Sequence, residues 1–293
     1  FREAWMSIKA DMYDVVLAVG VEQMGKGLLG GAGNGDGIAK EGLLGSGTMP
    51  CVFAEAGMEH AKEYGTTFEQ FAKISVKNHH HSTMNPKAMY QIETPLEDVM
   101  NAEMISYPNT KLMCSVNVDG SAAAVLVSEK KAKELGLARA VKVKASAMAS
   151  DPYTDRDLVM PDVNACTRLA AKDAYEQAGI GPEDVNLVEL HDCFATAEML
   201  HYENLSLCKD GEAGKMIDEG HVKLGGKVPV NVSGGLLSKG HPLGATGIAN
   251  IYEICTHLRG EAGKRQVEGA RIGLTHVIGL GTACGIHILE KTS

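Results

Sequence analysis

A glycine-rich segment before a predicted helix is the feature that most constrains the fold of this chain. It reads Asn-Val-Ser-Gly-Gly-Leu-Leu-Ser-Lys-Gly-His-Pro-Leu-Gly-Ala-Thr-Gly over residues 231–247, and the periodicity predicts the helix over 248–258. Glycines allow a tight loop whose backbone can approach another group closely. The segment places His241 near a helix start, where positive charge is disfavoured. We therefore expect a neutral imidazole that can act as a base.

A second cluster, His191-Asp192-Cys193-Phe194, directly follows the apolar run over 185–190, which predicts a buried strand. Two histidines and a thiol at the ends of successive α/β elements indicate nucleophilic acyl chemistry. Structural roles stay open on the residues alone. A histidine at a strand end is often only a hydrogen-bonded group, and a free cysteine is usually a small buried hydrophobic residue.

The rest of the chain alternates between predicted helices and strands, which indicates an α/β protein. Helices are predicted over 1–10, 52–64, 67–78, 86–91, 164–178 and 195–207, and strands over 14–21, 115–118, 122–127, 141–147, 270–278 and 284–290. Residues 25–47 are rich in glycine and are predicted to be mostly loop. A helix–strand–strand order at 1–127, interrupted at 25–110, resembles the order at 248–290.

Composition excludes several classes of function. The net charge of −9 argues against a general nucleic-acid binder, whose footprint would be basic. No apolar run approaches the length of a membrane-spanning helix. The seven cysteines form no Cys-x-x-Cys pair, which favours a reducing compartment over disulfides or zinc. Three adjacent histidines, 79–81, could suggest a metal, but adjacent side chains point apart and no spaced carboxylate or cysteine accompanies them. We therefore predict no metal.

The segment over 231–247 and the His-Asp-Cys-Phe cluster together resemble the thiolases. His-Asp-Cys-Phe is similar to the sterol-carrier-protein-type branch, whereas most other thiolases have Asn-Glu-Ala-Phe there. Shorter matches follow in order at 17–24, 77–80, 118–123 and 279–281, so the resemblance covers essentially the whole chain. It implies the α/β thiolase fold, with two similar βαβαβαββ halves packed as α-β-α-β-α layers and a lid insertion. The N-terminal half would be 1–135, with the insertion at about 25–110, and the C-terminal half 136–293.

The resemblance also implies an activity, that of an acyl-CoA acyltransferase. A 3-ketoacyl-CoA would be cleaved, or formed by Claisen condensation, through a cysteine acyl-enzyme. His241 would activate the nucleophile, His191 would bind the thioester oxygen, and Cys193 would be the acid/base. Cys284 is a reserve candidate for the acid/base, because the loop over 277–282 lacks the second cysteine of many thiolases.

Substrate contacts and partners follow from the same resemblance. Coenzyme A would be a substrate and no bound cofactor is expected. The residues expected to contact the substrate are Asn78, His79, Ser233, Gly234, Gly279 and Gly281. The family implies a homodimer in lipid metabolism, with β-oxidation-like degradation as the model, and we expect a cytoplasmic location. Members of the branch can also pair with a small partner that has an OB-fold and a zinc ribbon.

One departure from the family pattern leaves alternatives open. Thiolases attack with a cysteine shortly before the helix that here is predicted over 1–10, and the chain begins inside that helix. We therefore expect an upstream segment that carries the nucleophile. The first alternative is a retro-aldolase on a β-hydroxyacyl-CoA side chain that uses tyrosines, for which Tyr13, Tyr90 and Tyr202 are available. The second is a non-catalytic subunit of a heteromeric complex.

Overall fold

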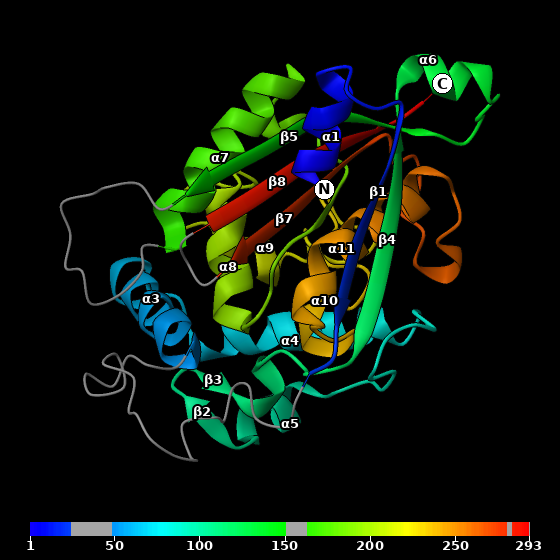
Figure 1. Ribbon diagram of the computed structural model, residues 1–293. Helices are drawn as coiled ribbons and strands as arrows, with labels where there is room; N and C mark the ends of the chain where they lie inside the picture. The colour runs from blue at the N-terminus through cyan, green and yellow to red at the C-terminus, as the bar shows by residue number, and fades with distance from the viewer. Residues whose placement is uncertain (25–48, 151–162, 280–282, 293) are drawn as a thin grey trace, which may run out of the picture.

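A four-stranded mixed sheet forms the centre of the C-terminal part. The computed structural model describes residues 1–24, 49–150, 163–279 and 283–292 (Figure 1). The strand order is β5-β8-β7-β6, in which β6 and β7 are parallel and the other neighbours antiparallel. The strands are β5 (Val141–Ser150), β6 (Leu187–Glu189), β7 (Ile272–Gly279) and β8 (Ala283–Lys291). β6 is fully buried, as expected for an apolar run with a parallel neighbour.

A second sheet consists of β1 (Val15–Glu22) and β4 (Gly120–Val127), which pair antiparallel with Ala18 opposite Ala124. Residues alternate between a buried and an exposed face along β1. The buried face carries small residues, and any side chain at Gly20 would collide with the backbone of Gly244. Glycine therefore lets the helix that begins at Leu243 lie directly against this sheet.

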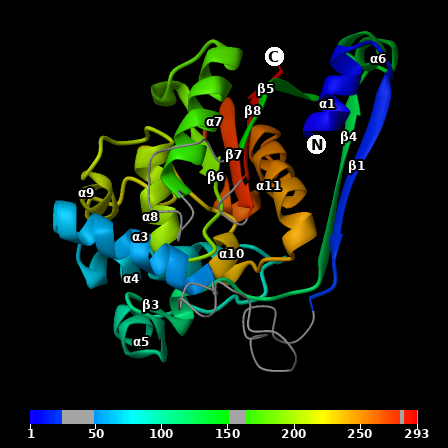
Figure 2. The ribbon, with the colours of Figure 1, turned by 60° about the vertical axis from the view of Figure 1, so that its left-hand side comes forward.

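Two helices lie between the sheets. α1 (Arg2–Lys9) and α11 (Leu243–Leu258) contact β1 and β4 on one side and the four-stranded sheet on the other (Figure 2). The far face of the four-stranded sheet is covered by α7 (Val163–Ala178), which packs against α8 (Ala195–Asn204). α7 ends as predicted at Gly179, whose φ is +65°. The described residues thus form four layers, β-α-β-α. The division into two similar halves remains a prediction.

The chain between β1 and β4 forms a helical insertion. Its described elements are α3 (Met49–Tyr64), α4 (Phe68–Ser82), α5 (Leu96–Asn101), β2 (Met104–Ser106), β3 (Asn109–Thr110) and η1 (Lys111–Met113). α4 starts with a capping box made by Thr67 and Gln70. It packs against α8, α9 (Ala213–Asp218) and α10 (Gly235–Ser238). The insertion therefore lies over the loops that follow β6.

Two predicted elements are wrong, and the glycine-rich loop over 25–47 lies outside the described residues. Residues 86–91 form turns instead of a helix, because the backbone N–H groups of Met89 and Tyr90 donate to the loop before His241. Residues 115–118 belong to no strand, because Ser115 and Val116 bond to other loops. The charged run over 129–134 is a solvated helix, α6 (Glu129–Glu134), as its composition indicates. Six other short helices were not predicted: α5, η1, η2 (Pro182–Asp184), α9, α10 and η3 (Gly263–Arg265).

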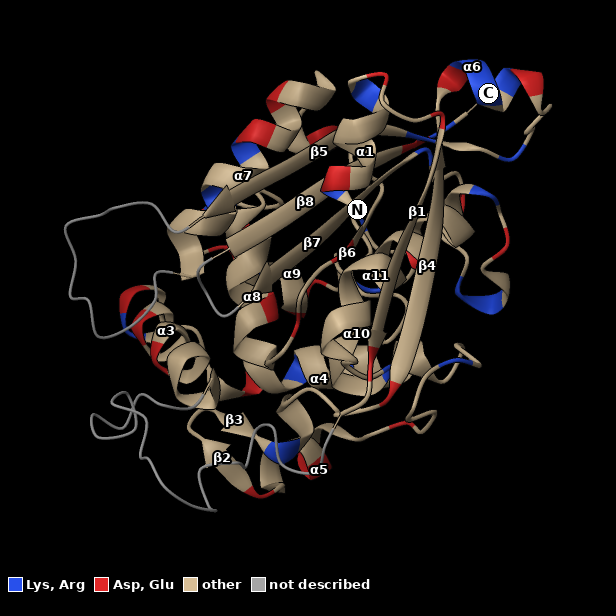
Figure 3. Cartoon of the chain, in the orientation of Figure 1, with Lys and Arg blue, Asp and Glu red and all other residues tan. Residues whose placement is uncertain are grey.

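The outer face of the β1–β4 sheet is apolar. Leu17, Val19 and Val21 are exposed by 59%, 60% and 70%, and Val125 by 65%. Charged side chains are sparse along these strands and frequent on α3, α6 and α7 (Figure 3). Exposed apolar surface of this kind is typical of interaction surfaces. Among the described helices, none combines the length and the apolarity that crossing a bilayer requires.

Candidate active site

His241 stands on a loop that the insertion holds in place. Its backbone N–H donates to the carbonyl of Val116 at 2.7 Å. Gly240 has a φ of +112°, and a side chain there would come within 2.6 Å of Val118, so only glycine fits. α11 begins directly after Pro242, earlier than the predicted start at 248. His241 is 6% exposed and lies directly before the N-terminal end of α11.

The hydrogen bonds of His241 define which ring nitrogen carries the proton. The Thr246 hydroxyl donates to the carbonyl of Pro242 at 3.0 Å, so its oxygen can only accept from the ring. Nδ1 of His241 lies 2.7 Å from that oxygen. Nδ1 therefore carries the hydrogen, and Nε2 keeps the lone pair that a base needs.

His241 is also held in the neutral state. Burial and, after it, the positive charge of Lys239 lower its pKa to about 4. At neutral pH the ring can accept a proton. Burial, more than the helix start that we invoked from the sequence, is thus the main cause of the neutral ring.

His191 lies beside His241. Their ring centroids are 4.9 Å apart and the rings are nearly perpendicular, at 87°. His191 follows the end of β6, where the side chain of Asn231 accepts the backbone N–H of Leu190 at 2.8 Å. Burial lowers the pKa of His191 well below its ordinary value, and His241 and His201 lower it further. Nδ1 of His191 is buried and has no hydrogen-bond partner among the described residues. The structure thus brings together two predicted histidines as neutral, adjacent rings.

Cys193 follows on the same loop and is 8% exposed. Its carbonyl accepts the backbone N–H of Ser115 at 2.9 Å, and Phe194 forms a β-bridge with Cys114. Burial raises the pKa of the Cys193 thiol well above its ordinary value, and the nearby Asp192 carboxylate adds to the effect. The thiol is therefore protonated at neutral pH, which suits a proton donor and not a resting nucleophile.

Asp192 fixes the loop between the two candidates. Its carboxylate accepts the backbone N–H groups of Leu236 at 2.8 Å and Leu237 at 3.3 Å, both in α10. Gly235 has a φ of +60°, and any side chain there would collide with this carboxylate. Burial, followed by the charge of Glu198, raises the pKa of Asp192. The His-Asp-Cys-Phe loop and the loop of His241 are thus joined through α10.

Asn78 contacts the loop that carries the candidates His191 and Cys193. Its amide donates to Asp192 at 2.8 Å and to Glu198 at 2.7 Å, and Lys77 forms an ion pair with Glu198 at 2.6 Å. Asn78 is fully buried. Its described contacts therefore position the Asp192 loop, a role that the sequence did not suggest.

The three adjacent histidines have three different surroundings. His80 is exposed and pairs with Glu93 at 2.7 Å. His81 is buried and bonds to the carbonyl of Asn231 and the N–H of Leu224. His79 is 3% exposed, lies against the ring of Tyr90 at 6.3 Å, and has both ring nitrogens buried without a partner. In the described residues no group of three histidine, cysteine or acidic side chains could hold a metal.

The remaining candidates are spread over several environments. Ser233 is buried, with its hydroxyl donating to Glu189 at 2.6 Å, and Gly234 packs against Ser82. Gly279 is exposed at the end of β7, whereas Gly281 lies outside the described residues. Cys284 is fully buried in β8, and burial raises its pKa to about 12. Ser233 and Gly234 thus stabilise the loop of His241 through their contacts with Glu189 and Ser82.

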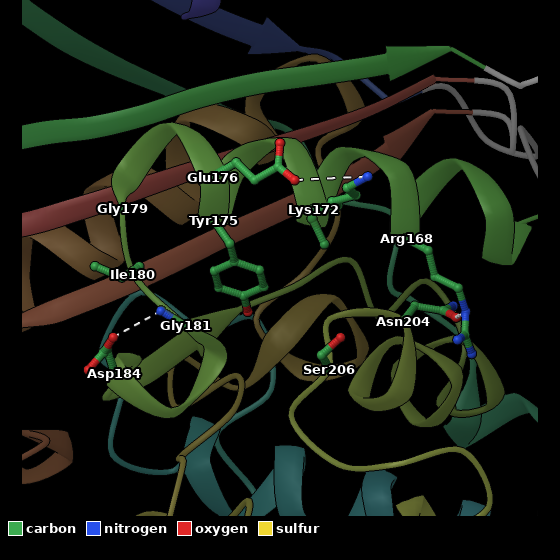
Figure 4. Close-up of a pocket in the computed structure, with 11 residues that line it drawn as sticks. Arg168, Lys172, Tyr175, Glu176, Gly179, Ile180, Gly181, Asp184, Asn204 and Ser206 are labelled. Carbon is green, nitrogen blue, oxygen red and sulfur yellow. Dashed lines mark hydrogen bonds and ion pairs between the residues drawn. The ribbon is translucent and has the colours of Figure 1, made fainter.

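Sequence reasoning missed the residues that orient these groups: Thr246, Asp192, Glu198, Lys239 and His276. Asp192, Lys239 and Thr246 carried a signal, since they belong to the two motifs, whereas Glu198 and His276 lie outside them. A pocket of about 660 Å³ lies elsewhere, between α7 and the segment after α8 (Figure 4), and none of the candidate catalytic residues lines it. Arg168 at its rim is paired with Asp210 at 2.7 Å. We assign no role in the proposed chemistry to this pocket.

Known proteins have related sequences and a similar fold. Residues 152–291 match the family described as Thiolase C-terminal domain-like. Sterol carrier protein 2 from Oryctolagus cuniculus is 43% identical over 297 residues, which cover 97% of this chain and 54% of that protein. Acetyl-CoA acetyltransferase from Methanothermobacter thermautotrophicus is 40% identical over 299 residues, covering 99% of this chain and 76% of the relative. The solved structure "Ltp2-ChsH2(DUF35) aldolase" superposes with a TM-score of 0.81 at 24% identity, covering 99% of this chain and 76% of that one.

The layered α/β fold, the paired histidine loops and these matches define the class: the chain belongs to the thiolase superfamily. Within that superfamily it is of the kind similar to the thiolase region of sterol carrier protein 2. Its relatives include an acetyl-CoA acetyltransferase and a subunit of a benzoylsuccinyl-CoA thiolase. The chain spans about half the length of the sterol carrier protein 2 relatives that it matches.

Proposed function

We propose that this chain supplies the catalytic histidines and the acid/base cysteine of a thiolase that cleaves, or forms, a 3-ketoacyl-CoA. The observation that carries the proposal is the neutral pair His241 and His191, whose ring centroids are 4.9 Å apart. One ring has a free Nε2 lone pair for a base, and the other has a buried nitrogen without a partner. A base next to a hydrogen-bond donor is what acyl transfer requires.

Each group has a defined part in thiolysis. Nε2 of His241 takes the proton of the attacking cysteine, whose thiolate adds to the 3-keto carbon. The bond between C2 and C3 breaks, and the Cys193 thiol protonates C2 of the leaving acetyl-CoA. The Cys193 thiolate then takes the proton of the incoming coenzyme A, whose thiolate accepts the acyl group. The released attacking cysteine regains its proton from His241. His191 donates its ring N–H to the thioester oxygen, where negative charge develops.

Further contacts with coenzyme A belong to the same proposal. The insertion brings His79 close to the loop before His241, since its neighbour Tyr90 donates to the carbonyl of Ser238 at 3.0 Å. Both ring nitrogens of His79 lack partners, which supports a hydrogen bond to the bound substrate. Asn78, Ser233, Gly234, Gly279 and Gly281 are further proposed contacts with the acyl-CoA substrate.

Binding of a thioester to a cysteine is the direct test of this function. The native protein is incubated with acetyl-CoA or acetoacetyl-CoA and analysed by intact and peptide mass spectrometry. An acetyl group on a cysteine, lost in the His241→Ala variant, supports a covalent thiolase. The Cys193→Ala variant should still be acylated and should fail to form or break the carbon–carbon bond. The absence of any adduct on the native protein would overturn the proposal.

The retro-aldolase alternative finds less support. Tyr202 is fully buried with its hydroxyl on Glu198, whereas Tyr13 and Tyr90 are exposed by 60% and 40% on separate segments. These three tyrosines form no common site in the described part of the chain. The aldolase similarity is one of fold, at 24% identity.

Partners complete the proposal. We propose a homodimer in the cytoplasm, with acyl-CoA and coenzyme A as substrates. The apolar outer face of β1 and β4 supports a protein contact on that side. The aldolase of similar fold has two named components, Ltp2 and ChsH2(DUF35). That pairing supports a small OB-fold and zinc-ribbon partner as the alternative, with this chain as one subunit of a heteromeric complex.

A further inference from the structure

Two further histidines, His201 and His276, lie close to His191, and the proposed chemistry uses neither. His276 belongs to β7 and His201 to α8, and both are fully buried. Their ring centroids are 4.3 Å apart. Buried polar side chains normally have a defined hydrogen-bonding task, because an unsatisfied polar group in a protein interior is costly. The contacts of His276 show such a task.

The hydrogen bonds of His276 leave one orientation of its proton. The Thr167 hydroxyl donates to the carbonyl of Val163 at 3.2 Å, so its oxygen accepts from Nε2 of His276, which lies at 3.2 Å. Nδ1 of His276 therefore keeps its lone pair. That nitrogen accepts the backbone N–H of His191 at 3.4 Å.

The strand pairing places these two residues next to each other. β6 and β7 are parallel, with Glu189 opposite Thr275, so the chain leaves β6 beside His276. The contact thus lies where the sheet ends and the loop of the catalytic candidates begins. Burial lowers the pKa of His276 well below its ordinary value, so the accepting lone pair is present at neutral pH.

The His191 ring has little else to hold it. Within the described part of the chain its Nδ1 has no partner, and its ring packs edge-on against His241. Its direction therefore depends on the backbone at His191. We propose that His276 is a positioning residue, which fixes that backbone through its Nδ1 and so aims the His191 ring at the thioester oxygen. The proposal rests on the thiolase function given above. It assigns His276 no contact with the substrate.

Three variants separate this role from simple core packing. His276→Leu fills the space but cannot accept the hydrogen bond, whereas His276→Asn keeps an acceptor at the δ position. His201→Leu is the matched control. His201 is as buried as His276 and packs against the His276 ring, but among the described residues it makes no hydrogen bond to His191. Thiolysis of acetoacetyl-CoA gives kcat and KM for each variant, and the amide proton shift of His191 is followed by NMR.

We expect His276→Leu to lower kcat by roughly 10-fold or more with little change in KM, because a misdirected donor weakens transition-state binding more than substrate binding. His276→Asn should recover most of kcat, and His201→Leu should stay near the wild type. The His191 amide should move upfield in His276→Leu alone. Equal losses in His276→Leu and His201→Leu, or an unmoved amide, would overturn the inference. If the wild type shows no thiolysis, the proposed function fails, and the amide shift still decides the positioning role.

Discussion

At the scale of single residues, the site depends on groups that control a proton without touching the substrate. His241 is a base only while Nε2 keeps its lone pair, and Thr246 secures this by accepting from Nδ1 at 2.7 Å. The arrangement is the familiar one in which a third group orients a catalytic histidine and selects its tautomer. We therefore expect the Thr246 hydroxyl to affect the activity of His241 as a base, although Thr246 lies within a helix.

Replacement of Thr246 by valine tests this point. Valine has nearly the same shape but cannot accept the Nδ1 hydrogen, so the ring can rotate or change tautomer. We expect kcat to fall between roughly 10-fold and 100-fold, the range seen when an orienting partner of a histidine is lost. Thr246→Ser keeps the hydroxyl and should retain most of the activity. An unchanged kcat in the valine variant would show that Thr246 does not orient the base.

Lys239 adds an electrostatic effect on the same ring. Its charge lowers the pKa of His241, after the larger effect of burial. In Lys239→Met that contribution disappears, the pKa of His241 rises, and the acid limb of the kcat/KM profile moves to higher pH. The loss of activity should be largest below about pH 6 and small near pH 8. Lys239→Arg keeps the charge and should leave the limb in place, whereas a shift in both variants would point to a packing effect.

The sequence could predict the reacting groups of this site better than their supports. His191, Cys193 and His241 stand in two motifs, and the structure brings both motif loops together through α10. Asn78 illustrates the limit: the substrate contact expected from the sequence stays a prediction, whereas the hydrogen bonds of its amide to Asp192 and Glu198 were not predicted. Those carboxylates lie more than a hundred positions away in the chain, and no local pattern reveals such a contact.

At the scale of elements, the loops contain glycines that are required for different physical reasons. Gly235 and Gly136 have nearly equal φ values, +60° and +62°, but a methyl group would collide with Asp192 at the first and meet nothing within 4 Å at the second. Gly136→Ala should cost about 1 kcal/mol, the cost of a left-handed backbone alone. Gly235→Ala should cost more, because α10 must move away from Asp192. Urea unfolding of both variants measures the difference.

Equal costs in these two variants would mean that α10 adjusts freely and that its link to Asp192 is weak. Kinetics gives a second distinction. Gly235→Ala should also lower kcat, since α10 joins the loops of His191 and His241, whereas Gly136→Ala should leave kcat unchanged.

Elements with a regular apolar pattern could be predicted, and elements formed by long-range contacts could not. Strands β1, β4, β5, β6, β7 and β8 and the long helix α7 begin and end within three residues of the prediction, whereas α11 begins five residues earlier. The predicted helix over 86–91 failed because its N–H groups bond to the loop at Ser238 and Lys239. The strand over 115–118 failed for the same kind of reason, since its partners are Cys193 and Leu236. Tertiary hydrogen bonds therefore overrode local preference.

At the scale of the whole molecule, the apolar face of β1 and β4 bears on the proposed homodimer. If this face is a protein contact, Leu17→Lys combined with Val19→Lys should weaken self-association, because charge would be buried without a partner. Leu169→Lys is the control, since Leu169 is 41% exposed on α7, which covers the far face of the four-stranded sheet. Sedimentation equilibrium measures the mass of each variant. A dimer that survives the double substitution would place the contact elsewhere.

Buried histidines give the whole molecule a defined response to acid. Eight histidines have lowered pKa values: His79, His81, His191, His201, His241, His257, His276 and His287. For His241 and His257 the value is about 4, and for His201 and His287 about 3. In the unfolded chain these groups take up protons near pH 6.5. The unfolded state therefore binds more protons at mildly acidic pH.

Each such histidine stabilises the fold fully above pH 6.5 and loses that contribution as pH falls towards its folded value, by about 1.4 kcal/mol per pH unit. Glu189 and Asp192 act in the opposite direction, because burial raises their pKa values. Histidines are more numerous, so a total stability of roughly 5–15 kcal/mol should be largely lost by about pH 5.

Urea unfolding at pH 7, 6 and 5 measures this loss, and one variant tests its cause. His257 lies outside the candidate site, in the last turn of α11, where it is buried and its Nδ1 accepts the backbone N–H of Val267 at 3.2 Å. His257→Gln cannot take up the proton, so the free energy of unfolding should fall less steeply with pH than in the wild type, by about 1.4 kcal/mol per pH unit. The variant should be less stable at pH 7, where the wild-type hydrogen bond is intact, and closer to the wild type at pH 5. Parallel curves for the two proteins would show that carboxylates, and not buried imidazoles, govern the acid transition.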